Sequence, residues 1–499
     1  MDLFTIGFPI ALSLHNLAYC FVGVFLGTFV GVLPGIGPLA TIALLLPFTF
    51  YMDPVTAMIM LAGVYYGSEY GGSITSILLN VPGGAASAVT ALDGYPMARQ
   101  GRAGVALLMT GVGSFIGGIV GIILLMILSP VIANLAIAFG PTEYFSVMVL
   151  GLLAAASIGK SGPAKGIAMV LVGILLGLIG IDVNSGVPRF DLDIYALYDG
   201  ISIAVLAMAL FGITEIISTF TEAPPDIIKA KVTLRSMIPT ADDVRRSVNP
   251  VLRGSGIGSF FGALPGTGPT LASFFSYLVE KRISKTPERF GHGAIEGVVS
   301  PEAANNAAAQ TAFIPMLTLG VPGTATMAVM LGAMMLHGIT PGPLLLTNNP
   351  EIFWGLIASF WIGNVMLILL NVPLVGIWVK LLSVPTHLLY PVIVTAVCIG
   401  TYSINSSVFD VGLICVFGGA GYFMRLVGLE PAPLLLGFIL GPLMEVYLRR
   451  ALLISEGDYW VLFQRPVSGV VLVIAILIVL WSVSLALRAA ITRKVGKAA

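Results

Sequence analysis

Long apolar runs separated by short polar segments recur along this chain. A helix needs about 20 apolar residues to cross a hydrocarbon core, and runs approaching that length lie at 105–128, 143–158, 166–181, 200–220, 352–372, 388–402, 408–424, 431–448 and 466–488. The stretches 17–94 and 252–337 are also apolar, but glycine and proline interrupt them repeatedly. The one long polar segment, 221–250, is typical of a linker. The pattern predicts an all-α integral membrane protein.

Composition agrees with this pattern and argues against other classes of protein. Hydrophobic residues make up 57% of the 499 residues and charged residues only 10%, against about 25% charged in a soluble domain. Lys+Arg and Asp+Glu balance at 24 each, so no basic surface for nucleic acid is expected. Three widely spaced cysteines give no disulfide framework. The 59 glycines and 31 prolines predict many helix breaks, which lipid tolerates only where protein or a water-filled cavity shelters them.

The sequence repeats itself. Gly31–Pro38 (GVLPGIGP) matches Gly262–Pro269 (GALPGTGP) at six of eight positions. Three further pairs follow in the same order, namely Val81–Gly83 with Val321–Gly323, Pro141–Thr142 with Pro385–Thr386, and Leu178–Asp182 with Leu426–Glu430. Four ordered matches indicate a duplication, with a first repeat at 1–220, the polar cytoplasmic linker at 221–250, a second repeat at 251–450, and a C-terminal loop, membrane helix and basic cytoplasmic tail at 451–499.

Positive charge indicates that the two repeats are inverted. Residues 44–56, after the first PGxGP motif, carry no Lys or Arg, whereas the matching segment 281–289 carries four. After the VPG motif the asymmetry reverses, with two arginines at 99–102 and none at 338–351. Because Lys and Arg concentrate in cytoplasmic loops, matched loops are expected on opposite faces of the membrane. This is the inverted-topology arrangement of many secondary carriers.

The repeated Pro/Gly motifs predict broken helices that hold a ligand. A helix that restarts after a break directs free N–H groups and its positive dipole end into the gap, which suits a carboxylate. The candidate substrate-binding residues are Asn80, Pro82, Gly83, Gly84, Ser87, Asn305, Asn306, Pro322, Gly323 and Thr324. The PGxGP turns, with Gly35, Gly37, Gly266, Thr267 and Gly268, are expected to line the cavity or bind a cation. Packing kinks are the alternative, but four motifs in symmetric pairs favour a site.

Two acidic residues, Glu69 and Glu302, fall within apolar stretches. A charge in the hydrocarbon core costs about 2.5–3.5 kcal/mol, so such a residue usually serves a function. Glu302 with the nearby amides offers oxygen ligands for a sodium ion or for the hydroxyls of an anion. Glu69 and Ser73 are expected to line the same cavity. The alternative for Glu302 is a helix-start position at an interface.

No motif for enzymatic chemistry is present. The sequence has no P-loop, HExxH or aspartate-rich motif, and its four histidines lack metal-ligand spacing. We therefore expect no enzyme activity, no cofactor and no certain metal site, with the driving force supplied by an ion gradient or a partner. A passive channel, which requires a continuous polar or ringed pore, stays open as an alternative.

Motifs in order along nearly the whole chain resemble those of the large membrane subunit of the tripartite tricarboxylate transporters. They are Gly31–Pro38, Tyr70–Ser73, Asn80–Gly83, Pro265–Pro269, Glu280–Arg282, Glu302–Ala307 and Gly338–Pro343. The resemblance implies a multi-pass permease of the bacterial inner membrane, with about 12 helical segments. It also implies a small four-helix membrane subunit and a periplasmic solute-binding protein as partners.

The resemblance further implies a substrate class and a driving force. The substrates would be carboxylates, from citrate to dicarboxylates, and a cation gradient would drive uptake, with sodium as the expected coupling ion. A proton-coupled carrier and a passive anion channel are the alternatives. Glu69 departs from the family's pattern, which usually has an uncharged residue there.

Overall fold

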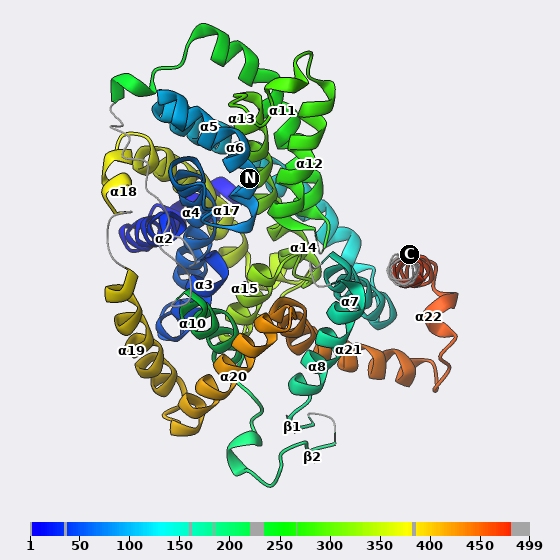
Figure 1. Ribbon diagram of the computed structural model, residues 1–499. Coiled ribbons are helices and arrows are strands. Elements are labelled where there is room, and N and C mark those ends of the chain that lie inside the picture. The colour runs from blue at the N-terminus through cyan, green and yellow to red at the C-terminus, as the bar shows by residue number, and fades with distance from the viewer. Residues whose placement is uncertain are drawn as a thin grey trace, which may run out of the picture.

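The computed structural model describes residues 2–33, 37–158, 162–182, 185–219, 234–265, 267–381 and 386–480. The described part is almost entirely helical (Figure 1). Five helical stretches in it are long and apolar enough to cross a membrane: Leu14–Val32, Ala85–Ile137, Pro350–Asn371, Val408–Leu426 and Pro431–Ile454. The predicted all-α class therefore agrees with the structure.

The first half of the chain contains most of the irregular elements. Its elements are η1 (Leu3–Gly7), α1 (Phe8–Ala11), α2 (Leu14–Val32), α3 (Pro38–Thr49), α4 (Pro54–Leu79), η2 (Ala85–Ser87), α5 (Ala88–Met97), η3 (Ala98–Arg102), α6 (Ala103–Ile137), α7 (Pro141–Ile158), α8 (Pro163–Gly177), β1 (Gly180–Ile181), β2 (Pro188–Arg189), η4 (Tyr195–Leu197), α9 (Ile203–Ala207), η5 (Met208–Ile213) and α10 (Thr214–Thr219). The antiparallel pair β1–β2 is a small departure from the expected all-helical chain.

The regular elements described in the second half of the chain are all helices. Its elements are η6 (Leu234–Met237), α11 (Ala241–Ala263), α12 (Gly268–Ile283), η7 (Pro287–Arg289), α13 (Glu296–Thr311), α14 (Phe313–Leu319), α15 (Ala325–Leu336), α16 (Leu345–Asn348), α17 (Pro350–Asn371), α18 (Val375–Leu381), α19 (Thr386–Asn405), α20 (Val408–Leu426), α21 (Pro431–Ile454) and α22 (Val461–Gln464), followed by an apolar helix at Pro466–Leu480.

Most predicted apolar runs coincide with helices, but two of these runs and the predicted polar linker differ. The run 166–181 ends as a helix at Gly177 and continues into β1. The run 200–220 is interrupted by the π-helical turn η5. Of the predicted linker 221–250, residues up to 233 lie outside the described residues, and 241–250 already form the first turns of α11.

Two central helices, α4 and α13, organise the packing. Helix α2 packs along α4, and α11, which carries the matching motif, packs along α13. Each central helix also contacts a long helix of the other half, since α6 lies along α13 and α17 lies along α4. The two halves are therefore interlocked and do not lie side by side as separate bodies.

Glycines at four-residue spacing allow this close packing. They are Gly23, Gly27 and Gly31 in α2, and Gly254, Gly258 and Gly262 in α11. A Cβ at these positions would come within 2.1–2.4 Å of a backbone oxygen of α4 or α13. Small residues allow helix backbones in lipid to approach closely, and packing rather than hydrophobicity holds such helices together. The same spacing in both halves is part of the duplication.

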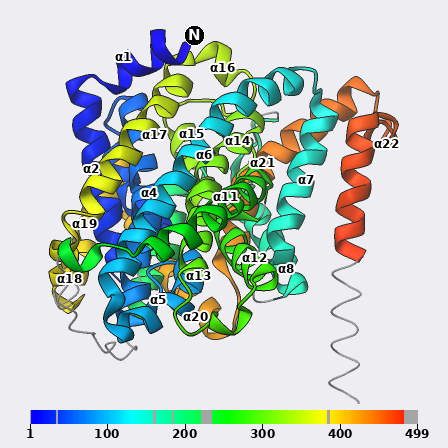
Figure 2. The ribbon, with the colours of Figure 1, turned by 90° about the horizontal axis from the view of Figure 1, so that it is seen from above.

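Two outer groups of helices flank this centre (Figures 1 and 2). In one, α7 and α8 of the first half pack with α21 of the second half. In the other, α19 and α20 of the second half pack with η5 and α10 of the first half. Each outer group thus combines helices from both halves, as the interlocked centre does.

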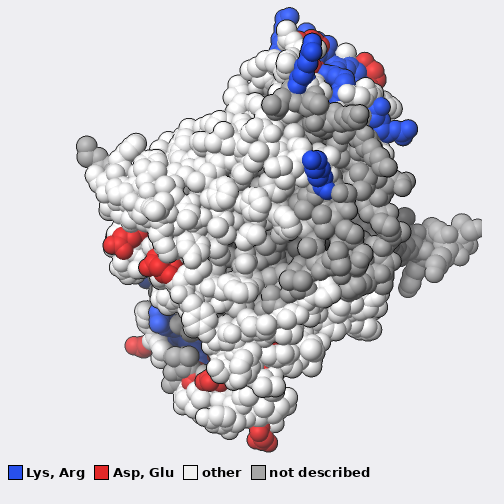
Figure 3. All heavy atoms as spheres, turned by 90° about the vertical axis from the view of Figure 1, so that its left-hand side faces the viewer, with Lys and Arg blue, Asp and Glu red and all other residues white. Residues whose placement is uncertain are grey.

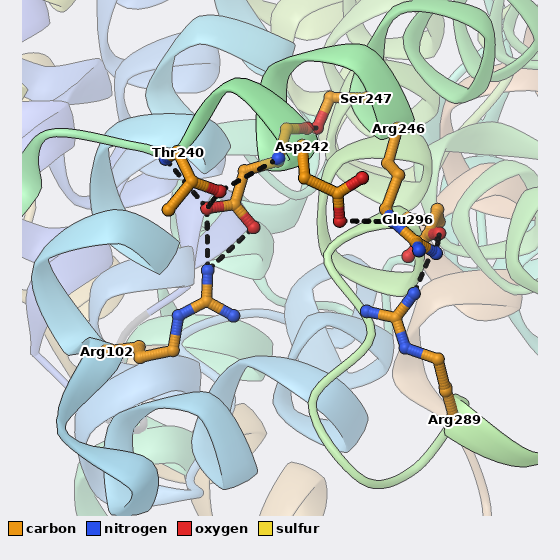
Figure 4. Close-up of polar contacts among 8 residues, drawn as sticks. Arg102, Thr240, Asp242, Arg246, Ser247, Arg289 and Glu296 are labelled. Atoms are coloured by element: carbon orange, nitrogen blue, oxygen red, sulfur yellow. Dashed lines mark hydrogen bonds and ion pairs between the residues drawn. The ribbon is translucent and has the colours of Figure 1, made fainter.

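Charged side chains gather at the ends of the helices. Figure 3 shows one face of the molecule, on which Lys and Arg gather mainly at the upper edge and most of the surface carries no charge. The start of α11 holds one such group, where Arg102 contacts both carboxylate oxygens of Asp243 at 2.6 and 2.7 Å. Figure 4 shows Arg246 of the same helix between Asp242 and Glu296, with Arg289 also paired to Glu296.

Asp243 is expected to stabilise the fold more than its neighbour Asp242. Its carboxylate also accepts hydrogen bonds from the N–H and hydroxyl of Thr240, which closes the capping box of α11. We expect Asp243→Asn to lower the free energy of unfolding by about 1–3 kcal/mol, because Arg102 and Thr240 lose the charged acceptor that the buried Asp243 provides. Asp242→Asn, in an exposed pair, should change it by less than about 1 kcal/mol. Thermal unfolding of the purified protein measures both.

The contribution of Asp243 should also depend on pH. Burial alone raises the pKa of Asp243, but hydrogen bonds from Arg102 and Thr240 outweigh burial and lower the pKa below its usual value. A carboxyl with a depressed pKa stabilises the folded state above its unfolded pKa, and this stabilisation is lost as the pH falls through the folded pKa. The difference between wild type and Asp243→Asn should therefore shrink below about pH 4. An unchanged difference at low pH would contradict this assignment.

Candidate functional site

The first half contains two helix breaks, both close to the expected motifs. Helix α2 ends at Val32, and α3 starts at Pro38 after the extended residue Gly37. Gly35 of this turn lies outside the described residues. Helix α4 ends at Asn80, whose left-handed backbone (φ 55°) stops the helix before the VPG motif. A short 3-10 turn, η2, then leads into α5.

The second half breaks at the same motifs. Helix α11 ends at Ala263, and α12 begins at Gly268, which has a φ of +63° that favours glycine. Gly266 lies outside the described residues. Helix α14 ends at Gly320, again with a left-handed backbone (φ 68°). Thr324 then caps α15 by accepting a hydrogen bond from the N–H of Met327 at 3.2 Å.

Within each half the two breaks contact each other. A Cβ on Gly83 would lie 2.2 Å from the carbonyl oxygen of Gly31, so the first VPG motif rests on the end of α2. In the second half, Gly323 lies beside the carbonyl of Leu264, and Gly268 lies against the methyl group of Thr324. Breaks far apart in the sequence therefore form one compact unit in each half.

The two units also meet across the halves. η2, which follows the first VPG motif, lies against α12 of the second half, and α15, which follows the second VPG motif, lies against α3 of the first half. All four predicted breaks thus belong to one neighbourhood at the contact between the halves. Open space adjoins it, because no other described atom lies within 4 Å of a Cβ placed on Gly37 or Gly84.

The two VPG units differ in which backbone donors are free. The N–H of Gly83 donates to Gly72 O at 3.4 Å, and the N–H of Gly84 donates to Ser87 Oγ at 3.2 Å. Within the described part of the chain, the N–H groups of Gly323 and Thr324 have no hydrogen-bond partner. The donors expected to be free in both halves are therefore free only in the second half in this conformation.

Exposure also differs between the two VPG units. Pro82 is exposed in the first half, whereas its match Pro322 is buried in the second half, although Gly83 and Gly323 are both buried. The matching motifs thus occupy different environments in one and the same conformation. An alternating-access protein is expected to show such a difference when its site opens toward one side.

Glu302 is fully buried at the contact between the halves. It lies in the second turn of α13, and its two oxygens accept hydrogen bonds from Thr90 in α5 and from Ser114 in α6, the latter at 3.3 Å. Both hydroxyls belong to the first half, although Glu302 belongs to the second. The alternative, a helix-start position at an interface, does not fit, because Glu302 lies beyond the first turn of α13 and is 0% exposed.

Glu69 lies on α4, the central helix that contacts α13. Its carboxylate is near the side chain of Asn305 and close enough to Glu302 for the two charges to interact. Asn305 and Asn306 are 0% and 1% exposed, and the side-chain oxygen of each has no hydrogen-bond partner in the described structure. The structure thus brings together four of the predicted site residues, Glu69, Glu302, Asn305 and Asn306.

Other predicted residues serve the local backbone. The hydroxyl of Ser73 donates to Tyr70 O at 2.8 Å, and that of Thr267 donates to Leu264 O at 3.0 Å. Ser87 is buried and closes its own turn by donating to Gly84 O at 2.9 Å. In the described residues, no group of three His, Cys, Asp or Glu side chains is placed to hold a metal ion.

Three residues of this neighbourhood were not predicted. Thr90 and Ser114 bond to Glu302, and Asn364 of α17 links α4 to α6 by accepting from Tyr70 at 3.0 Å and donating to Phe115 O at 3.0 Å. Single Thr, Ser and Asn residues in apolar helices carry no motif, so only the packing reveals them. Polar residues that face other helices in this way are common inside membrane proteins.

Comparison with known proteins places this chain in a family. A model of the tripartite tricarboxylate transporter TctA family matches residues 17–436. An uncharacterised 52.8 kDa protein from the TAR-I region of Agrobacterium vitis is 50% identical over 479 residues, which is 95% of each chain. A second uncharacterised protein, from the TAR-II region of Agrobacterium vitis, is 58% identical over 212 residues, 42% of this chain and 88% of its own. No solved structure gives a significant match.

Proposed function

Because this chain belongs to the tripartite tricarboxylate transporter TctA family, a family of multi-pass membrane proteins, we propose that it is the permease subunit for uptake of organic di- or tricarboxylates across the bacterial inner membrane. A cation gradient drives uptake, and sodium is the first expectation. A small four-helix membrane subunit completes the membrane complex, and a periplasmic solute-binding protein delivers the substrate.

One observation supports this proposal above the others. Four helix breaks from two matching halves meet, and the break before α15 presents the N–H groups of Gly323 and Thr324, which have no partner among the described residues. Free N–H groups at the start of a helix bind anions, and the helix dipole adds to the attraction. A citrate-like substrate carries several carboxylates, and in this conformation the second unit, whose donors have no partner among the described residues, gives one of them a binding place.

The inverted-repeat topology predicted from charge fits the same proposal. Matching helices make matching contacts in the two halves, while the two VPG units differ in exposure and in their free donors. Exchange of these two environments between the halves would turn an outward-open site into an inward-open site. The first unit then frees the donors of Gly83 and Gly84 when the second unit closes.

Uptake into proteoliposomes tests the proposed function. The chain is reconstituted with its small subunit and binding protein, and labelled di- and tricarboxylates are supplied with and without an inward sodium gradient. We expect accumulation against the concentration gradient that requires both sodium and the binding protein. Accumulation driven by a proton gradient instead would mean that the protein is a carrier whose coupling ion is the proton and not sodium. Equilibration without accumulation for every substrate would favour a passive anion channel.

A further inference from the structure

Two buried carboxylates near the α5–α13 contact have very different surroundings. Asp93 accepts hydrogen bonds from the N–H groups of Gly291, Gly293 and Ala294, each at 2.8 Å, and from the hydroxyl of Tyr277. Such a set of donors compensates a buried negative charge. Glu302 is equally buried but receives only two hydroxyl hydrogen bonds, from Thr90 and Ser114. Its charge is therefore far less compensated than that of Asp93.

The surroundings of Glu302 add negative charge and oxygen atoms. Glu69 is close enough for the two carboxylates to repel each other. Neither carboxylate forms an ion pair with Lys, Arg or His among the described residues. Asn305 faces Glu69 and is 0% exposed. Neither polar atom of its side chain has a hydrogen-bond partner in the described structure.

Further unpartnered oxygens follow the same helix. The side-chain oxygens of Asn306 and Gln310 have no hydrogen-bond partner in the described structure. The amide nitrogen of Asn306 donates to Glu302 O at 3.2 Å, which fixes the orientation of the amide and leaves its oxygen free. Residues 302, 306 and 310 share one face of α13, since four residues make about one helical turn. The free polar atoms at this site are mainly acceptors.

We propose that Glu69, Glu302 and Asn305 form a binding site for one monovalent cation, either a sodium ion or a proton, at the contact between α4 and α13. The inference rests on the proposed function and assigns its coupling ion to residues of both halves. Two carboxylates without a positive partner require a neutralising charge in the membrane interior. Carboxylate and amide oxygens are the ligands that hard cations prefer, and one proton shared between two carboxyls also removes their repulsion.

This location gives the cation a role in the transport cycle. α4 carries the first VPG motif at its end, and α13 runs toward the second through α14. Without a cation, repulsion between Glu69 and Glu302 opposes the contact of α4 with α13, and with a cation the contact is favoured. A ligand shifts an equilibrium between conformations by its difference in affinity for them. Cation binding would thus favour the packed arrangement of the halves.

The groups that surround Glu69 and Glu302 determine which ionisation could cause a pH-dependent change at this site. Around Glu302 they are the hydroxyls of Thr90 in α5 and Ser114 in α6, with Glu69 and Tyr70 in α4. Around Glu69 they are Asn305 and Glu302 in α13, with Tyr65 in its own helix. Tyrosines ionise at about pH 10. Histidines elsewhere in the chain ionise at about pH 6.5, so the part of a pH response near neutrality that Glu69→Gln or Glu302→Gln removes would report on the two carboxyls.

Melting temperatures of the purified full-length protein test the site without any carboxylate substrate. They are measured from about pH 5 to about pH 9, in sodium chloride and in choline chloride of equal ionic strength. A sodium site predicts that sodium raises the melting temperature of the wild type. A proton site predicts no sodium effect and a melting temperature that falls as the pH rises, because the folded state then loses a proton that it binds.

Variants assign either response to the proposed residues. Glu302→Gln should abolish the sodium or pH response of the melting temperature. For a sodium site, Glu69→Gln should raise the half-saturating sodium concentration at least about tenfold. For a proton site, Glu69→Gln should remove the pH response. Glu280→Gln, whose carboxylate pairs with Arg253 at 2.7 Å away from the site, should keep the wild-type response. If Glu302→Gln does not fold, the response of Glu69→Gln alone tests whether these residues bind the cation.

Two outcomes would overturn the proposal. One is a wild type whose melting temperature depends on neither sodium nor pH in this range. The other is a response that Glu69→Gln and Glu302→Gln leave unchanged. Because no carboxylate is present, either result would leave the proposed uptake of carboxylates standing. A failed uptake assay, in turn, would leave a measured cation site intact.

Discussion

Gly83→Ala is expected to reduce carboxylate uptake by roughly ten- to a hundredfold, since overpacking costs about 1–3 kcal/mol and each 1.4 kcal/mol is tenfold. A Cβ at this position would lie 2.2 Å from Gly31 O and 2.6 Å from Gly72 Cα. Both neighbours are backbone atoms that cannot rotate away. The VPG unit would therefore have to move off the end of α2, which displaces the donors of Gly83 and Gly84. Initial uptake rates, normalised to the amount of protein in the membrane, measure the effect.

Two further glycine substitutions separate packing from the site itself. Gly256→Ala, on a helix face with no described atom within 4 Å of the new Cβ, should leave uptake unchanged and should not lower the melting temperature, because alanine is the better helix former inside α11. Gly84→Ala also meets no neighbour, and its extended backbone (φ −151°) accepts alanine. Its methyl group would enter the open space beside the break, so the melting temperature should stay the same while KM rises. An unchanged KM would mean that this space is not the substrate cavity.

The architecture could be predicted from the sequence where a local rule decides it. Apolar runs located most membrane helices, because length and hydrophobicity suffice to define a span. The helix breaks predicted at the two VPG motifs are present in the structure, where α4 stops at Asn80 and α14 stops at Gly320, because proline after the break cannot continue a helix and the residue before it is restricted. The small strands β1 and β2, and the π-helical turn η5, were not predicted. They depend on contacts with other segments.

The packing between the halves could not be predicted, because it depends on no local signal. Glycine spacing in α2 and α11 does indicate close helix contacts, and it was available in the sequence. It does not say which helix lies opposite. The bonds from Thr90 and Ser114 to Glu302 cross from one half to the other, so neither residue could be assigned beforehand.

The duplication also predicted more symmetry than the structure has. Matching motifs give matching breaks, but the N–H groups of Gly83 and Gly84 have partners, whereas those of Gly323 and Thr324 have none among the described residues. If the two halves exchange environments as we propose, one conformation presents them in different states. Sequence similarity between the repeats therefore predicts which residues of the two halves correspond. It does not predict which of the corresponding N–H groups are free to bind a ligand in a given conformation.

Replacing Pro322-Gly323 with Ala-Ala is expected to reduce uptake more than a hundredfold, since two hydrogen bonds to a charged group contribute about 1.5–3 kcal/mol each and each 1.4 kcal/mol is tenfold. Pro322 has no N–H and disfavours helical backbone in the residue before it. Alanine removes both restrictions, so α14 can extend toward α15. The N–H groups of Gly323 and Thr324 would then be used inside a helix and lost to the substrate.

Membrane insertion of this variant should remain intact, because alanine is apolar and a good helix former. Pro350→Ala is the matched control. Pro350 occupies the first position of α17, where no intrahelical hydrogen bond is lost to proline, so its replacement should leave uptake unchanged. Wild-type uptake by the Ala-Ala variant, with both proteins inserted equally, would show that substrate binding does not need these donors. The carboxylate site would then have to lie elsewhere than at the second VPG motif.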